Sequence, residues 1–206
     1  MKFLIADDHA IVRKGLIQLL REEFPTVEVT EVSNSTEALE EARKQTLNLI
    51  LLDISMPGRN GIETLKQMRA EGIKAPILML SIHPEEQYAV RALKAGASGF
   101  LNKESATEEL LVAVHKVLAG RKYISSSVAE KLAGLLGETG KKPAHDLLSD
   151  REMQVLQHIA SGKTVSEIAA EISLSVNTIS TYRTRILEKL SLPTNLLMER
   201  SSLTRL

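Results

Sequence analysis

Short runs of consecutive apolar residues alternate with stretches of helix-like apolar spacing over the first 120 residues. Unbroken apolar runs of this length are typical of strands buried on both faces of a parallel sheet, and strict period-two alternation is typical of an edge strand. The predicted strands are 2–6, the alternating 27–32, 49–53, 77–81 and, after a Gly-rich turn, the run that ends at Lys103. The predicted helices are Ala10–Glu22, one capped by Ser35, one carrying Ile62, Leu65 and Met68, one from Pro84 to near Gly96, and one over Leu110–Leu118.

Strand and helix alternate five times in this region, which predicts an α/β fold with a doubly wound, five-stranded parallel sheet. Right-handed crossovers and an edge position for the second strand give the strand order 2-1-3-4-5. The order reverses between the first and third strands. A ligand site is therefore expected where these two strands end, because open α/β sheets bind ligands at such switch points.

A change in composition marks a joint between residues 120 and 148. Ser125 can start a short helix whose apolar positions are Val128, Leu132, Leu135 and Leu136. Residues 137–143 are rich in Gly, Lys and Pro, and this composition is typical of a flexible linker. We therefore divide the chain into a first domain at 1–120, a linker with a short helix at 121–146, and a second domain at 147–206.

The second domain has the pattern of an all-helical unit. Ser149 and Glu152 have the spacing of a capping box at the start of a helix that ends at Gly162. A short helix follows over Val165–Ile172, and Ser175 is expected to cap the next one. In that last helix, Val176, Ile179, Ile186, Leu187 and Leu190 are predicted to face inward. Two helices joined by a tight turn, the second polar on its outer face, are typical of a helix-turn-helix.

Net charge changes this picture little. Lys and Arg total 26, as do Asp and Glu, so any DNA-binding surface must be local, and we expect it to need dimerisation. The chain has no Cys, which excludes disulfides and thiolate zinc sites. No apolar stretch approaches the roughly 18 residues of a membrane span, and the chain begins in a strand with no signal peptide pattern. We expect a cytoplasmic protein without a membrane partner.

Three carboxylates follow two of the predicted central strands. Asp7 and Asp8 come after the first strand, and Asp53 ends the third. A lone Asp at a strand end is commonly a helix cap or turn residue. Three carboxylates that meet at one sheet edge, however, repel one another unless a cation or protons neutralise them. Hard oxygen ligands with room for water favour Mg²⁺, and Mg²⁺ with open coordination positions is typical of phosphoryl transfer.

A cation and a hydroxyl are predicted at the same edge. Ser81 ends the fourth strand and Lys103 ends the fifth. Taken alone, each is also compatible with a solvated strand end or a turn hydroxyl. With the carboxylates they favour a phosphoryl site, in which Lys103 contributes charge and Ser81 a hydrogen bond.

Hydroxyl, amide and basic side chains occupy the predicted outer face of the last helix. Hydroxyl groups and arginines can bind phosphates, and Arg or Asn can hydrogen-bond base edges. The same composition also fits a solvated amphipathic helix. The candidate DNA contacts are Asn177, Thr178, Ser180, Thr181, Arg183, Thr184, Arg185 and Lys189.

Residues 1–120 contain a set of motifs in a fixed order and at characteristic spacing. They are the acidic pair Asp7-Asp8, Asp53 followed by Met56-Pro57 and Gly61, then Ser81, and Phe100 three residues before Lys103. On these motifs, residues 1–120 resemble the CheY-like receiver domain of a two-component response regulator. The resemblance implies that Asp53 accepts a phosphoryl group from a sensor histidine kinase.

The same resemblance implies a ligand set and a switch. Mg²⁺ would be held by Asp8, Asp53 and the backbone carbonyl of Ser55, with Asp7 acting through water. Ser81 and Phe100 would be the switch residues. Ser81 stands where Thr is also common, and Phe100 stands where Tyr is frequent, so Phe100 offers no phenol hydroxyl.

Residues 147–192 resemble the LuxR-type helix-turn-helix of NarL/FixJ regulators. The resemblance rests on residues 148–152 (LSDRE), Gly162, 167–169 (EIA), Thr178-Ile179 and Lys189-Leu190. Together the two resemblances imply a phosphorylation-controlled transcription regulator. Its implied partners are a histidine kinase and double-stranded promoter DNA, and it would form a homodimer when phosphorylated.

Two other functions remain open from the sequence. One is a metal-dependent phosphatase with an aspartyl nucleophile; such enzymes often carry a second acid two residues after the nucleophile, and here that position is Ser55. The other is a DNA-binding protein independent of phosphorylation, which the presence of Asp8, Asp53 and Lys103 disfavours. The preferred reading is not an enzyme on other substrates, because its chemistry is confined to its own phosphorylation and dephosphorylation.

The tail departs from the family pattern after Asn195. Leu196, Leu203 and Leu206 can share a helical face, but Arg200 interrupts it, and Ser and Thr are weak helix formers. We therefore expect a marginal last helix and weak dimers on DNA.

Overall fold

The computed structural model describes residues 1–57, 59–82, 85–125, 128–130 and 147–190. The chain forms two compact units, Met1–Glu138 and Thr139–Leu206. Each unit is described by itself below. The tail after residue 190 and most of the expected linker helix lie outside the described residues.

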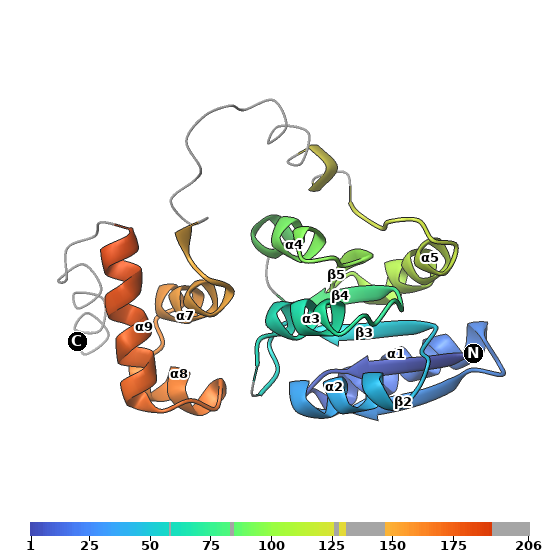
Figure 1. Cartoon of the computed structure of the whole chain (residues 1–206), viewed down its shortest axis with the longest axis horizontal. Coiled ribbons are helices and arrows are strands. Elements are labelled where there is room, and N and C mark those ends of the chain that lie inside the picture. The colour runs from blue at the N-terminus through green and yellow to red at the C-terminus, as the bar shows by residue number, and fades with distance from the viewer. Residues whose placement is uncertain (58, 83–84, 126–127, 131–146, 191–206) are drawn as a thin grey trace. The chain divides into compact units, whose positions relative to one another are not determined.

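The first unit contains the predicted parallel sheet (Figure 1). Its strands are β1 (Lys2–Ala6), β2 (Glu28–Val32), β3 (Leu49–Asp53), β4 (Ile77–Ser81) and β5 (Gly99–Asn102). Its helices are α1 (Ala10–Glu23), α2 (Ser35–Lys44), α3 (Gly61–Ala70), α4 (Glu85–Lys94) and α5 (Ala106–Leu118). All pairings are parallel, and the order β2-β1-β3-β4-β5 confirms the predicted topology.

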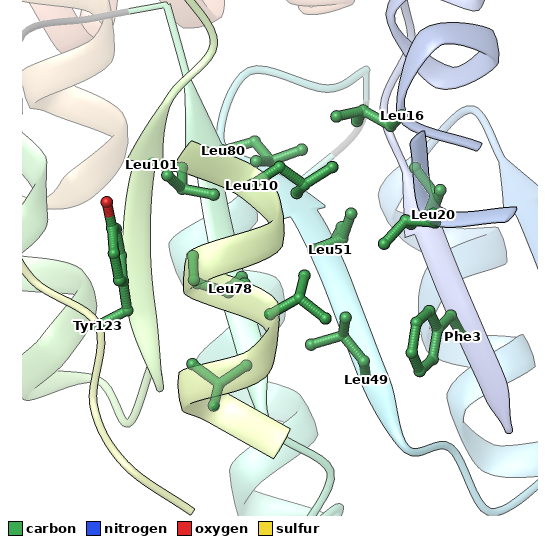
Figure 2. Packing of buried hydrophobic residues seen from close by; sticks show 14 of the residues in the cluster. Phe3, Leu16, Leu20, Leu49, Leu51, Leu78, Leu80, Leu101, Leu110 and Tyr123 are labelled. Atoms are coloured by element: carbon green, nitrogen blue, oxygen red, sulfur yellow. The ribbon is translucent and has the colours of Figure 1, made fainter. Parts of the chain in front are cut away.

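Helices cover both faces of this sheet. One face packs against α1 and α5, which contribute Leu20 and Leu110 to a cluster with Leu49, Leu51 and Leu78 (Figure 2). Because successive strand residues point to opposite faces, the neighbouring positions of these strands face α2, α3 and α4. Burying one large aliphatic side chain contributes about 1.5–3 kcal/mol, so the two apolar layers supply most of the stability of this unit.

The β3–α3 connection is fixed by residues far apart in the sequence. Ser35 was expected to cap α2, but the cap is Asn34, whose side chain accepts a hydrogen bond from the backbone N–H of Glu37. The buried Ser35 hydroxyl instead accepts from the N–H of Arg59 at 2.8 Å and donates to the carbonyl of Pro57 at 3.3 Å. These two hydrogen bonds restrain the loop that follows Asp53.

Residues 121–125, which we call the strap, belong structurally to the first unit. Tyr123 pairs with Gly99 beside β5, donates its N–H to the carbonyl of Ser98 at 2.9 Å, and accepts from the N–H of Phe100 at 3.4 Å. A Cβ on Gly99 would lie 2.6 Å from the carbonyl oxygen of Tyr123, so only glycine allows this approach. The sequence placed these residues in the linker, yet Tyr123 is part of the buried cluster shown in Figure 2.

The second unit holds the helices α7 (Asp150–Ala160), α8 (Val165–Glu171) and α9 (Val176–Lys189). The predicted capping box of Ser149 and Glu152 is present, and a second box joins Thr164 and Glu167. Both α7 and α8 pack against α9, whose Ile179 and Ile186 are fully buried.

One inward position was wrong. Val176, the first residue of α9, is 46% exposed. The cap expected at Ser175 is confirmed, since its side chain accepts from the N–H of Thr178. Ser173, in the turn between α8 and α9, has a left-handed φ of 54°. Thus the helix-turn-helix prediction holds, with one surface apolar residue reassigned.

Candidate functional site

The strand register gathers the candidate residues at one edge of the sheet. Ala6 lies opposite Leu52 in the β1–β3 pairing, so Asp7 and Asp53 leave the sheet side by side. Ser81 pairs with Asn102 at the ends of β4 and β5, and the N–H of Lys103 donates to the Ser81 carbonyl at 2.8 Å. Four residues that are widely separated in the sequence therefore meet where the sequence predicted a site.

Lys103 is the charge partner of two buried carboxylates. Its Nζ lies 2.7 Å from Oδ2 of Asp7 and 2.9 Å from Oδ2 of Asp53. The Lys103 side chain is 6% exposed, whereas the Asp7 and Asp53 side chains are 0% and 1% exposed. Two negative groups share one positive group in a place with little water, so the pocket keeps an excess of negative charge.

The pocket also keeps unused acceptor capacity. The Asp53 carboxylate faces Lys103 and the backbone of Ser55, while Oδ2 of Asp7 and Oδ1 of Asp8 are buried without a well-formed hydrogen bond among the described residues. Nζ of Lys103 lies close to Asp7 and Asp53, and Nδ1 of His9 lies 2.8 Å from Oδ1 of Asp8. Ligand atoms from Asp7, Asp8, His9 and Asp53 all lie within 4.8 Å of one another. Clustered carboxylate oxygens of this kind are suitable ligands for a hard divalent cation.

The local electrostatics shift two pKa values. Burial raises the pKa of Asp53 to about 6; Asp7 adds to that rise, while the charge and hydrogen bond of Lys103 and a backbone hydrogen bond from Ser55 oppose it. Burial alone would lower the pKa of Lys103, but the charges and hydrogen bonds of Asp53 and Asp7 outweigh it and raise that pKa. Both effects follow from two carboxylates that face one ammonium in a poorly solvated pocket.

The loop after Asp53 is held close to the strand. Gly61 donates its N–H to the carbonyl of Ile54 at 2.9 Å. A Cβ at Gly61 would lie 2.1 Å from the Asp53 carbonyl oxygen. The buried Asn60 caps α3 through a hydrogen bond from the N–H of Ile62 at 2.8 Å. Gly61 and Asn60 thus bring the start of α3 against the end of β3. This close approach restrains the connection from β3 to α3, in which Ser55 lies.

The exposed polar residues of α9 form the second candidate site. Asn177, Ser180, Thr181, Thr184 and Arg185 are exposed. The Ser180, Thr181 and Thr184 hydroxyls lie 3.0, 2.9 and 3.2 Å from the carbonyl oxygens of Val176, Asn177 and Ser180. Thr178 is half-buried, and its hydroxyl lies 2.7 Å from that of Ser175.

Comparisons with known proteins decide the family. Residues 3–115 match the response regulator receiver domain, and residues 146–195 match the bacterial regulatory proteins of the luxR family. The response regulator UvrY of Escherichia coli K12 is 33% identical over 190 residues, which cover 92% of this chain and 87% of that protein. The chain belongs to the LuxR-type response regulators of two-component systems.

Other relatives agree. The response regulator GacA of Pseudomonas syringae is 33% identical over 194 residues, covering 93% of this chain and 90% of that protein. Among solved structures, RcsB of Salmonella enterica serovar Typhimurium, bound to the promoter rprA in the presence of the phosphomimetic BeF₃⁻, covers 98% of both chains at 27% identity with a TM-score of 0.64. Both predicted resemblances are thereby confirmed, and this protein is a DNA-binding response regulator.

The structure places two basic candidates of the response regulator differently from the sequence analysis. Nζ of Lys189 lies 2.7 Å from Oε2 of Glu152, a carboxylate that also accepts the N–H of Ser149 at 2.7 Å. Arg183 is half-buried, and its Nη2 is fully buried without a hydrogen bond among the described residues. In this structure Lys189 joins the end of α9 to the start of α7, and Arg185 is the exposed basic candidate that forms no ion pair among the described residues.

The receiver pocket contains contacts that sequence reasoning missed. His9 donates its N–H to Oδ1 of Asp7 at 2.8 Å, and its Nδ1 lies 2.8 Å from Oδ1 of Asp8. Arg13 donates to the Asp7 carbonyl at 2.7 Å and pairs with Glu31 at 3.0 Å. His9 adjoins the acidic pair in the sequence and was a detectable signal, whereas the Arg13–Glu31 pair joins α1 to β2 and has no local signature.

The switch candidates are both fully buried. Ser81 lies at the end of β4, beside the Lys103 backbone. Phe100 precedes Leu101 in β5 and therefore faces the α4 side of the sheet, while Leu101 faces α1 and α5. Within the described ranges, every helix is too short or too polar to cross a lipid bilayer.

Proposed function

We propose that Asp53 of this response regulator accepts a phosphoryl group from a sensor histidine kinase and that phosphorylation controls the binding of α9 to promoter DNA. The observation that carries the proposal is the buried Asp53 carboxylate at the end of β3, with Lys103 Nζ at 2.9 Å and with Asp7 and Asp8 in the same cluster. A lysine beside a carboxylate nucleophile can neutralise charge on an incoming phosphoryl group.

The transfer step uses the residues at the sheet edge. A carboxylate oxygen of Asp53 bonds to the phosphorus of a phosphohistidine, and the phosphorus–nitrogen bond breaks with its electron pair going to the imidazole. Lys103 neutralises charge on the phosphoryl oxygens, and the Ser81 hydroxyl donates a hydrogen bond to one of them. The resulting acyl phosphate leaves Lys103 with a new anionic partner.

The acidic cluster fits Mg²⁺. Asp8 and Asp53 would supply carboxylate oxygens, the backbone carbonyl of Ser55 a third ligand, and Asp7 a contact through water. When bound, Mg²⁺ neutralises charge on the phosphoryl group and orients it. In support, the four acidic or imidazole groups of the pocket lie within 4.8 Å of one another, and the cluster carries more negative than positive charge.

The output is assigned to the second unit. We propose that residues 1–120 together with the strap form the receiver, that the rest of 121–146 is the linker, and that 147–206 is the DNA-binding domain. Equal totals of basic and acidic residues, 26 each, argue for weak binding by a single copy. A phosphorylated homodimer that reads two half-sites gains effective concentration. A regulator of promoter DNA in a bacterial two-component system acts in the cytoplasm.

Turnover on other phosphate compounds is not part of the proposal. An aspartyl phosphatase commonly has an acid two residues after its nucleophile to protonate the leaving group, and Ser55 occupies that position. We infer that the chemistry of this protein is limited to gain and loss of its own phosphoryl group.

The test combines a small acyl phosphate, Mg²⁺ and a promoter fragment. The wild-type protein should take up about one label per chain that hydroxylamine removes, and should bind DNA more tightly afterwards. The Asp53→Asn variant should take up none and bind DNA as the unphosphorylated protein does, because an amide is a poor nucleophile.

Each contrary outcome has its own meaning. Rapid catalytic release of phosphate without accumulation of hydroxylamine-labile label on the chain would support the phosphatase instead. Equal DNA affinity of the labelled and unlabelled protein at fixed salt would refute control by phosphorylation.

A further inference from the structure

Three exposed hydroxyl side chains, Ser180, Thr181 and Thr184, lie on one side of α9, and we call them the hydroxyl face. Each oxygen lies 2.9–3.2 Å from the backbone carbonyl oxygen four residues earlier. A carbonyl oxygen can only accept, so the single hydroxyl hydrogen of each side chain must be donated into the helix. What each hydroxyl offers outward is therefore an oxygen with free lone pairs.

Because these hydroxyl hydrogens are donated to helix carbonyls, the hydroxyl face can bind only some of the groups of DNA. Phosphate oxygens are acceptors, and so are N7 and O6 of guanine, N7 of adenine and O4 of thymine. None of them can bond to a hydroxyl that has already used its hydrogen. The major groove contains two donors, the N6 amino group of adenine and the N4 amino group of cytosine.

The neighbouring residues extend the same character. Glu188 lies one turn beyond Thr184 and is exposed on the same side of α9. A carboxylate only accepts hydrogen bonds, and Glu or Asp can accept from N4 of cytosine in the major groove. Thr181, Thr184 and Glu188 thus follow one another at helical spacing as a row of acceptors, with Arg185 exposed beside them.

We propose that the hydroxyl face reads the amino groups of adenine and cytosine as a hydrogen-bond acceptor and that it is not a phosphate clamp. The proposal rests on the proposed role of α9 as the DNA-binding helix. It sharpens the interpretation made from the sequence alone, in which hydroxyl groups were general candidates for DNA contacts, phosphates included. Phosphate binding is left to groups that still have free donors, among them Arg185.

The competing explanation is that these bonds are local and are exchanged on binding. Ser and Thr in helices commonly bond to the carbonyl four residues earlier. A hydroxyl could then rotate and donate to a phosphate, which requires that its bond to the helix be broken first. The two explanations differ in what they demand of the DNA, namely amino groups at defined bases or phosphates at any sequence.

The experiment begins with the phosphorylated full-length protein and selection of binding sites from random duplex DNA. Each adenine of the selected site is then replaced by 2-aminopurine, which pairs with thymine but moves the amino group to the minor groove. Each cytosine is replaced by N4-methylcytosine, which removes the major-groove hydrogen. Affinities are measured for the wild type and for Ser180→Ala, Thr181→Val and Thr184→Val.

We expect at least one analogue to weaken wild-type binding by roughly three- to tenfold, as loss of one hydrogen bond does. The same analogue should have less than about twofold effect on the variant that lacks the matching hydroxyl, because the lost contact is then already absent. Ser161→Ala is the control: this exposed hydroxyl also bonds to its own backbone, at 2.8 Å from the His158 carbonyl, but lies outside α9.

Three outcomes would overturn the proposal. They are insensitivity of the wild type to every analogue, equal sensitivity of wild type and variants at every position, or variants that weaken binding to all sequences alike and lower the salt dependence. Failure of the proposed function would look different: without a DNA-binding role for α9 no sequence would be enriched in the first step, and without control by phosphorylation the unphosphorylated protein would enrich the same sites equally.

Discussion

The two units place their functional groups in opposite surroundings. In the receiver, Asp7, Asp53 and Lys103 are nearly without exposure, and the one lysine partly neutralises the two carboxylates at the ends of three strands. On α9 the candidate DNA contacts are exposed, and several bond to their own helix. Changes in the receiver pocket should therefore alter chemistry and fold together, whereas changes on the outer face of α9 should alter recognition alone.

The largest effect is expected from Lys103→Met. The substitution leaves two buried carboxylates without their cation, which should destabilise the receiver by about 3 kcal/mol in metal-free buffer. Mg²⁺ should restore more stability to the variant than to the wild type, since it neutralises the same carboxylates. Hydrogen exchange of the β3 amides measures both effects.

Lys94→Met, which removes an exposed lysine of α4, is the matched control and should leave exchange unchanged. If Lys103→Met exchanged like the control, the buried charges would be less dependent on Lys103 than the distances indicate.

Arg69→Met should separate stability from chemistry in the same unit. The Arg69 guanidinium donates to the carbonyls of Gly96, Ile73 and Ala75 at 3.0, 2.6 and 2.9 Å. Losing these bonds should cost the receiver about 2 kcal/mol. Phosphorylation at low temperature should remain near the wild-type rate, because Arg69 touches none of the pocket residues.

Urea unfolding, with the exposed Arg21→Met as a control, measures that cost. A large loss of phosphorylation in folded Arg69→Met protein would show that the remote loops and the pocket are coupled.

On α9, Arg185→Met and Lys189→Met should have different consequences. Loss of Arg185 should weaken all DNA sequences alike and reduce the slope of log affinity against log salt by about 1. Loss of Lys189 should leave that slope nearly unchanged, because its Nζ is bound to Glu152.

The loss of Lys189 should instead reduce the stability of the second unit by up to about 1 kcal/mol, since the lysine is 40% exposed and solvent screens the pair. Glu152→Gln combined with Lys189→Met should show non-additive stability. A reduced salt slope for Lys189→Met would return this residue to the set of DNA contacts.

The smallest effect concerns pH and His158. Burial lowers the pKa of His158; the charge of Glu171 opposes this and that of Lys163 adds to it. The unfolded chain therefore takes up a proton at higher pH than the folded one. The stabilisation is complete above the ordinary histidine pKa near 6.5 and is lost as pH falls below it. His158→Gln should remove this part of the pH dependence between about pH 7 and 5, as measured by unfolding of the second unit.

Much of the fold and the receiver pocket could be predicted from local sequence because the determinants are periodic. Apolar runs predicted the positions of the strands. Once the strand order is known, a carboxylate at the end of such a run can be placed at a particular edge of the sheet. The residues that were missed depend on contacts between distant segments. Ser35 is locally an acceptable helix cap, and only the position of the β3–α3 loop makes Asn34 the cap instead.

Lys189 and Tyr123 show the same limit. Lys189 sits at the end of a helix with a polar outer face, from which we predicted a DNA contact, and its ion pair with Glu152 was not predicted. The buried Glu152 that binds it lies 37 residues earlier in the sequence. Tyr123 is a single aromatic residue after a glycine, without periodicity, and its place beside β5 follows from the missing side chain of Gly99.

The strap has a consequence for how this chain behaves in solution. A parallel sheet has two edges, and an uncovered edge can pair with a strand of another molecule. At the β2 edge, Glu28 and Glu31 are exposed and oppose such pairing by charge. At the β5 edge the strap itself occupies the hydrogen-bonding groups of Ser98 and Phe100. A fragment cut at residue 120 would uncover that edge and favour aggregation, whereas a fragment that keeps Tyr123 and Ser125 retains its protection.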